Sequence, residues 1–119
     1  MKLITKEIEK RLLKNGQFRC SLQAEGKAEP DFLPVVKLFT PDAGCTWLLT
    51  ELDPDNPDIA FGLCDLGFGT PELGYVSIAE LAAVRGRLGL PVERDRYFSP
   101  EKSLKAYTEE ARASGHIQA

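Results

Sequence analysis

The sequence predicts an α+β fold, with residues 1–119 as one domain. We expect a mostly antiparallel sheet of four to five strands, and about three helices packed mainly on one face. Between residues 35 and 76, runs rich in β-branched and aromatic residues follow one another with short turns between them, which favours antiparallel pairing. The helical patterns lie before and after most of these runs, as in α+β proteins.

The first helix is expected to begin after Thr5, a good N-cap residue, and to end at Gly16. The apolar residues that repeat on one side of it at helical spacing are Ile8, Leu12 and Leu13. Residues 17–34 combine glycine and prolines with charges. This composition predicts a long connection, with an edge strand near residues 18–22.

A β-hairpin is expected from residue 35 to residue 52. In its second strand Trp47 and Leu49 should point to one side and Leu48 and Leu52 to the other, because side chains alternate along a strand. Both faces of the sheet would then be at least partly covered. The next predicted segments are the hairpin turn 41–44, a loop over 53–58, a strand over 59–64, a break over 67–71 and a strand over 73–76.

Ser77 and Glu80 have the spacing of a capping box, which predicts a helix starting at this point. Its buried stripe should be Ile78, Leu81, Val84 and Leu88, with Gly86 near its end. A tight turn at 89–91 and a short charged strand from Val92 follow. Ser99–Pro100 is expected to open the last helical region and Gly115 to end it, with Leu104, Tyr107 and Ala111 on one face.

Charge is spread unevenly along the chain, although the net charge is only −3. Residues 1–27 carry seven Lys or Arg against three Glu, residues 28–84 one Lys against ten acids, and residues 85–119 seven against five. The acidic middle could serve a basic partner, or the basic ends an anionic one. An ordinarily solvated surface is the commoner outcome, because blocks in sequence need not become patches in space.

The sequence lacks the motifs of several common activities. The acidic loop 53–64 has neither the glycine nor the final glutamate of a calcium loop, and residues 67–72 lack the third glycine of a dinucleotide fingerprint. One histidine, His116, and no Cys-x-x-Cys pattern give no zinc site. We therefore expect no metal and no cofactor. Cys64 is expected to be a small core residue.

Seven residues are the candidates for a functional site. Glu93 and Asp95 should point to one face of an extended strand and Arg94 and Arg96 to the other. Carboxylates can act as acid and base, and arginines can hold a phosphate or carboxylate. Ion pairs on an edge strand are the commoner alternative. The candidate residues are Trp47, Glu51, Glu72, Arg85, Glu93, Arg94 and Asp95.

Several separated blocks of the sequence carry a resemblance to a known family; in order, they are 1–6, 37–41 with Trp47, 50–54, 61–62, 72–77 and 88–95. Together they resemble the bacterial family known as domain of unknown function 2958. The resemblance spans nearly the whole chain and implies no known activity, cofactor or catalytic residue. Relatives of this family are often encoded on plasmids and other mobile elements, which implies an accessory role in plasmid biology.

Three functions fit these observations. The first is a small cytoplasmic, non-catalytic interaction module with a protein partner. The second is an enzyme for an anionic substrate, with Glu93 or Asp95 as acid or base and Arg94 and Arg85 as a clamp; it needs Glu51 or Glu72 close by. The third is weak nucleic-acid binding, which the net charge disfavours. No membrane partner is expected, because no apolar run is long enough to cross a bilayer. Three widely spaced cysteines and an early charged segment predict a cytoplasmic location.

Overall fold

The computed structural model of the chain describes residues 3–119; Met1 and Lys2, which the first resembling block includes, lie outside the described residues. The elements, in chain order, are α1 (Lys6–Ala24), β1 (Val36–Phe39), β2 (Thr46–Asp53), β3 (Asn56–Asp65), β4 (Glu72–Ser77), α2 (Ile78–Ala83), β5 (Glu93–Arg94) and α3 (Leu104–Ser114). The α+β class is confirmed.

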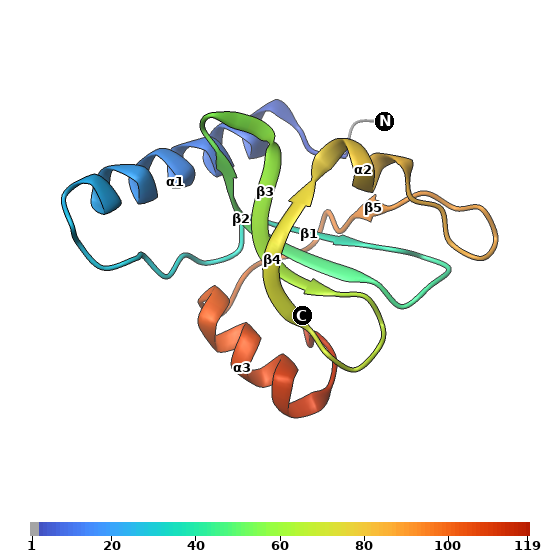
Figure 1. Ribbon diagram of the computed structural model, residues 1–119. Helices are drawn as coiled ribbons and strands as arrows, with labels where there is room; N and C mark the ends of the chain where they lie inside the picture. The colour runs from blue at the N-terminus through green and yellow to red at the C-terminus, as the bar shows by residue number, and fades with distance from the viewer. Residues whose placement is uncertain (1–2) are drawn as a thin grey trace.

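All five of these strands belong to one antiparallel sheet in the order β4-β3-β2-β1-β5. Helices α1 and α2 lie on one side of it and α3 on the other (Figure 1). The larger core cluster combines Leu12 of α1 and Leu81 of α2 with Trp47 of β2. The smaller cluster packs Leu104 and Tyr107 of α3 against the other face. Both faces are therefore covered, with two of the three helices on the same side.

Many of the expected elements form where the sequence places them. The hairpin 35–52, the break at 67–71 and the strand at 73–76 are confirmed. Gly115 ends α3 in the left-handed conformation, with a φ of 82° that favours glycine. The last helix begins later than expected: its N-cap is Ser103, whose hydroxyl accepts from the N–H of Ala106 at 3.2 Å.

The first helix is longer than its sequence pattern indicates. Thr5 is its N-cap, as expected, but α1 continues past Gly16 to Ala24, so the predicted connection and edge strand within 17–34 are wrong for residues 17–24. Gly16 is a buried helical residue, and a Cβ atom there would overlap the carbonyl oxygen of Leu52. The glycine therefore permits close approach of helix and sheet and does not end the helix.

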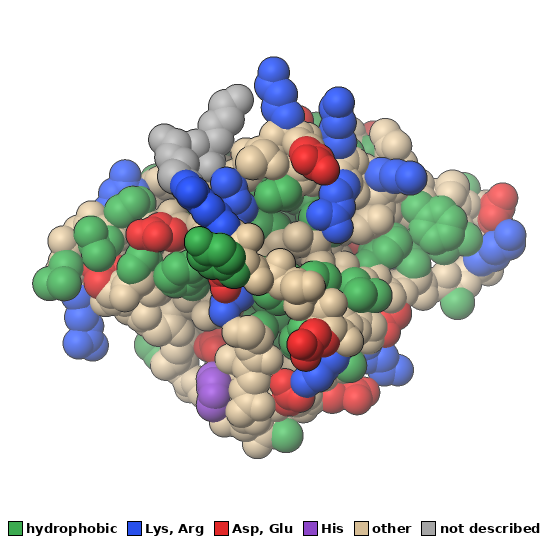
Figure 2. Space-filling view, turned by 180° about the vertical axis from the view of Figure 1, so that it is seen from behind, with side chains coloured by type: hydrophobic (Ala, Val, Ile, Leu, Met, Phe, Trp, Pro, Cys, Tyr) green, Lys and Arg blue, Asp and Glu red, His purple; other side chains and the backbone are tan. Residues whose placement is uncertain are grey.

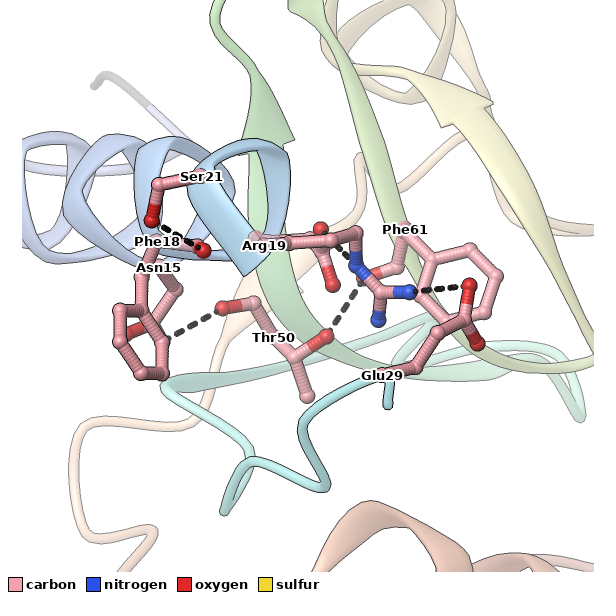
Figure 3. Close-up of polar contacts among 8 residues, drawn as sticks. Asn15, Phe18, Arg19, Ser21, Glu29, Thr50 and Phe61 are labelled. Atoms are coloured by element: carbon pink, nitrogen blue, oxygen red, sulfur yellow. Dashed lines mark hydrogen bonds and ion pairs between the residues drawn. The ribbon is translucent and has the colours of Figure 1, made fainter. Parts of the chain in front are cut away.

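Polar contacts hold the second half of α1 on the sheet (Figure 3). The side chain of Asn15 donates to the carbonyl of Thr50 at 2.8 Å, and Arg19 Nε donates to Glu51 Oε2 at 2.6 Å. Arg19 also pairs with Glu29 at 2.9 Å, and its guanidinium lies 5.3 Å from the centre of the Phe61 ring. An apolar stripe is thus not what keeps this part of the helix in place.

A bulge in β2 reverses the expected side-chain alternation. The pairing of β2 with β3 shifts between Leu49 and Glu51. As a result Leu52 joins Trp47 and Leu49 in the larger core, whereas the sequence placed it with Leu48 on the opposite face. The loop expected over 53–58 is also shorter, because β2 and β3 extend to Asp53 and Asn56 with only two residues between them.

Helix α2 has the expected start and an earlier end. The Ser77 hydroxyl accepts from the N–H of Glu80 at 3.2 Å and donates to Asp58, whose other oxygen accepts from the N–H of Ala79 at 2.9 Å. The helix ends at Ala83, and the side chain of Leu88 is 81% exposed, so its place in a buried stripe is wrong. None of the helices in residues 3–119 is both long and apolar enough for a membrane span.

Candidate functional site

A hollow of about 1120 Å³ runs along β5, the end strand of the sheet next to β1. Its walls come from β1, the β1–β2 hairpin, the end of α2, the segment 91–97 and residue 3. The charged side chains that line it are Lys37, Arg85, Glu93, Arg94, Asp95 and Arg96, and its apolar or aromatic side chains include Phe39, Pro91, Val92 and Tyr97. We call this hollow the β5 groove.

The alternation predicted for the charged strand agrees with its pairing on β1. Arg94 lies opposite Leu38, a core residue of the α1 side, and its Nη1 donates to the carbonyl of Leu3 at 2.8 Å. Glu93 lies opposite Phe39, the next residue along β1, and is therefore directed to the other face.

Asp95 also belongs to that other face. Its carboxylate lies 3.6 Å from Lys37 Nζ, and it accepts from the N–H of Tyr97 at 2.9 Å. Lys37 in turn donates to the main-chain oxygen of Ala119 at 2.6 Å. Asp95 therefore shapes the turn after β5 and orients a lysine in the β5 groove, which leaves it poorly placed as a general base.

The rim of the β5 groove is fixed by a contact between two turns. Asp42, in the β1–β2 hairpin, accepts from the N–H of Leu88 at 2.6 Å and from that of Leu90 at 3.2 Å. Its carboxylate occupies the space that a side chain at position 86 would need, so Gly86 permits the contact. Arg85 begins this turn, and its Nη1 donates to the carbonyls of Ala82 and Val84 at 3.0 and 2.8 Å, which closes the end of α2.

The structure brings four of the seven candidate residues together and separates the other three. Glu93, Arg94, Asp95 and Arg85 all line the β5 groove. Glu51 lies under α1 with its side chain only 7% exposed and paired with Arg19. Glu72 and Trp47 line a smaller hollow at the β4 end of the sheet. The cluster of carboxylates that the enzyme hypothesis needs is therefore not assembled.

Two lining residues that the sequence did not single out complete the β5 groove. Tyr97 is 94% exposed, and Lys37 is the one lysine or arginine of the acidic segment. Asp42, which holds the rim, was assigned only to a turn. An aromatic residue directly after Glu93–Arg96 was a usable signal for Tyr97. The roles of Lys37 and Asp42 depend on pairings between distant segments, which no local sequence pattern contains.

The acids of the middle segment are largely used within the fold. Those that accept main-chain N–H groups are Asp31, Asp42, Asp53, Asp58 and Asp65, and Glu29 and Glu51 pair with Arg19. Acidic side chains are scattered over the face shown in Figure 2, whereas Lys and Arg side chains gather along its upper part. The acids of the middle segment therefore do not form a continuous acidic surface for a basic partner on this face.

Two residues outside the β5 groove, Cys64 and Arg19, have pKa values that their surroundings raise. Burial raises the pKa of the Cys64 thiol to about 11, so it is protonated at neutral pH, in keeping with a core residue. Burial lowers the pKa of Arg19, but the hydrogen bond and the charge of Glu51, with those of Glu29, outweigh this and raise it overall. Within residues 3–119, no three His, Cys, Asp or Glu side chains are grouped as a metal site.

Comparison with known proteins gives a family and no activity. The model of the family described as "Protein of unknown function (DUF2958)" matches residues 3–118. Comparison with curated proteins and with solved structures found no match.

Proposed function

The chain belongs to the family of the protein of unknown function DUF2958, and we propose that it is a small non-catalytic binding module that holds an extended acidic segment of a protein partner in the β5 groove. The observation that carries this proposal is the lining of the β5 groove. It combines four cationic side chains, two carboxylates and exposed apolar surface beside an end strand of the sheet.

The charges of the β5 groove favour an anionic ligand. Its cations are Lys37, Arg85, Arg94 and Arg96, against Glu93 and Asp95. Two of them are already oriented by main-chain contacts: Arg94 by the carbonyl of Leu3 and Arg85 by those of Ala82 and Val84 at the end of α2. A side chain that is already ordered loses less entropy when it binds a carboxylate, and guanidinium groups suit carboxylate geometry.

The same lining favours a peptide over a nucleic acid. The two carboxylates alternate with arginines along residues 93–96, and they would repel a phosphate backbone that carries a charge at every nucleotide. Side chains of an extended peptide alternate between the two faces of the sheet, so its acidic ones can meet Arg94 and Arg96 while its apolar ones contact Phe39 on the other face. Because β5 is an end strand, an extended peptide can also pair with its main chain.

The test uses a labelled peptide that alternates glutamate and valine, followed by fluorescence anisotropy at low salt. We expect saturable binding that weakens at least roughly tenfold when Arg85 and Arg96 are both changed to Glu, because two favourable charge contacts become repulsive. Arg87→Glu is the matched control. It makes one Arg-to-Glu change where the double variant makes two, lies two residues from Arg85 and outside the lining of the β5 groove, and should leave affinity unchanged.

Two further probes decide between the alternatives. A peptide that alternates lysine and valine should not bind, and a mixed-sequence single-stranded DNA should bind more weakly than the acidic peptide. Stronger binding of the DNA would replace the peptide by the nucleic-acid function. Failure of the acidic peptide to bind would overturn the proposal.

We also propose that the protein acts in the bacterial cytoplasm as an accessory protein of a plasmid or other mobile element. The family resemblance supports the genetic setting, and three cysteines without disulfide partners support a reducing compartment. Fractionation of the native host, together with sequencing of the replicon that carries the gene, tests both parts. Recovery in a secreted or periplasmic fraction, or a chromosomal gene outside any mobile element, would contradict the corresponding part.

A further inference from the structure

The opposite end of the sheet, formed by β4, is an exposed strand edge with apolar side chains. Leu73 and Tyr75 are 41% and 72% exposed, and Leu66 and Phe68, in the loop before β4, are 53% and 83% exposed. The Tyr75 ring packs against Phe61 with ring centres 5.0 Å apart. Beside these residues is a hollow of about 350 Å³, lined by Trp47, Cys64 and Gly74 among others.

The β4 edge lacks the usual protection of an end strand. Such edges commonly carry lysines, proline or a bulge, which prevent pairing with another chain. β4 carries one charge, Glu72 at its first residue, and its pairing with β3 runs in regular register from Glu72 to Ser77. By contrast, charged side chains occupy both residues of β5, at the other end of the sheet.

We infer that β4 pairs antiparallel with β4 of a second copy, across a twofold axis at Gly74, so that the two sheets become continuous. Residues directly opposite each other in an antiparallel pair point to the same face, so the axis must pass through a residue position for the faces to match. With Gly74 on the axis, each Leu73 faces Tyr75 of the other copy.

The side chains support this register and a weak interface. Each Glu72 faces a Val76, so no like charges lie opposite each other, whereas an axis at Tyr75 would place Leu73 opposite Ser77. The exposed parts of residues Phe68 and Tyr75, the two aromatic residues at this edge, amount to roughly 230–390 Å² per copy. That is less than the ~800 Å² per partner of a standard interface, so a dimer in the weak, transient class is expected.

Sedimentation equilibrium across micromolar to millimolar concentrations tests for the dimer. The wild-type protein should shift from monomer to dimer over this range, and Tyr75→Lys should remain monomeric because it places an ammonium in the edge. The control Leu88→Lys changes an exposed leucine in the turn held by Asp42 and should dimerise like the wild type. A wild-type protein that is monomeric at every concentration would overturn the inference and leave the β4 edge to a different partner.

A cysteine at the axis tests the register. In a Cys20→Ser background, Gly74→Cys should form an intermolecular disulfide, because opposed Cα atoms in an antiparallel pair lie within disulfide range. The structure has open space for this side chain. Glu72→Cys is the control, since its two copies would be separated by four residues along the strand. Equal disulfide yields at the two positions, or a dimer that persists in Tyr75→Lys, would contradict pairing at Gly74.

Discussion

Arg19 of α1 joins a buried partner and an exposed one: its Nε donates to Glu51, 7% exposed, and its Nη1 pairs with Glu29, 81% exposed. Arg19→Ala should therefore lower the free energy of unfolding by about 3 kcal/mol, because it leaves the Glu51 carboxylate buried without its cation. Chemical denaturation measures the loss.

Glu29→Ala is the matched comparison, since it removes the exposed partner of the same guanidinium and should cost no more than about 1 kcal/mol. The double variant Arg19→Met with Glu51→Leu should recover most of the lost stability, because it removes both charges together. Equal losses for Arg19→Ala and Glu29→Ala would mean that burial of Glu51 does not set the energy.

Gly16→Ala should destabilise the protein although it lies inside a helix. Alanine is favoured over glycine in helix interiors by about 1 kcal/mol, but the added Cβ would overlap the Leu52 carbonyl. A net loss of about 1–3 kcal/mol is expected, measured by thermal or denaturant unfolding. Gly74→Ala, which has open space at its Cβ, should be at least as stable as the wild type. A stabilised Gly16→Ala variant would show that α1 can move away from β2 at little cost.

The start of α2 should depend on pH through Asp58. The hydrogen bond from the Ser77 hydroxyl, followed by that from the Ala79 N–H, lowers the pKa of Asp58. A lowered pKa stabilises the fold above the usual aspartate range, and the effect is lost as pH falls through the folded-state value. Asp58→Ala should thus be less stable than the wild type at neutral pH, with a difference that shrinks in acid. Denaturant unfolding at several pH values measures the difference, with Asp55→Ala, at an exposed aspartate in the adjacent turn, as the control.

The cysteines should differ in reactivity. The thiolate is the reactive form, and burial raises the pKa of Cys64 to about 11, whereas Cys20 is exposed on α1. At mildly alkaline pH an alkylating reagent should label Cys20 well before Cys64, as mapped by peptide mass spectrometry. Labelling in denaturant should remove the difference. Equal labelling rates in the folded protein would show that Cys64 is readily exposed by local opening.

The parts of the fold that follow from local chemistry were predictable from the sequence. Turn residues at 41–44 and 67–71, the cap at Ser77 and the left-handed Gly115 each act on the backbone within a few residues of their own position. The length of α1 was not predictable in this way. The chain past Gly16 has a mostly polar pattern, and what holds it is Arg19 and Asn15 on a bulge in β2. Such contacts depend on tertiary structure.

The candidate site was predictable in the same uneven way. The segment 93–96 is dense in charge, and it does line the β5 groove. Glu51 was a candidate from the sequence, but it pairs with Arg19 under α1 and does not line the β5 groove. Asp42 was not a candidate, because it holds the rim only when its hairpin meets the turn 86–90. The residue types of segment 93–96 were enough to identify the charged strand. The residues that lie around it depend on how distant segments pair, which the sequence pattern does not show.

The pairing of Leu38 with Arg94 also bears on the order in which the molecule folds. Strands β1 to β4 pair with their neighbours in sequence. By contrast, β5 pairs with β1, from which β2, β3, β4 and α2 separate it in the sequence. Closing that long loop costs more chain entropy than forming a hairpin, so this pairing is expected to be slower. The meander is therefore expected to form first and the β5 groove to be completed last. Amide protons of residues 93–95 should accordingly exchange with solvent at a lower opening energy than those of β2 and β3.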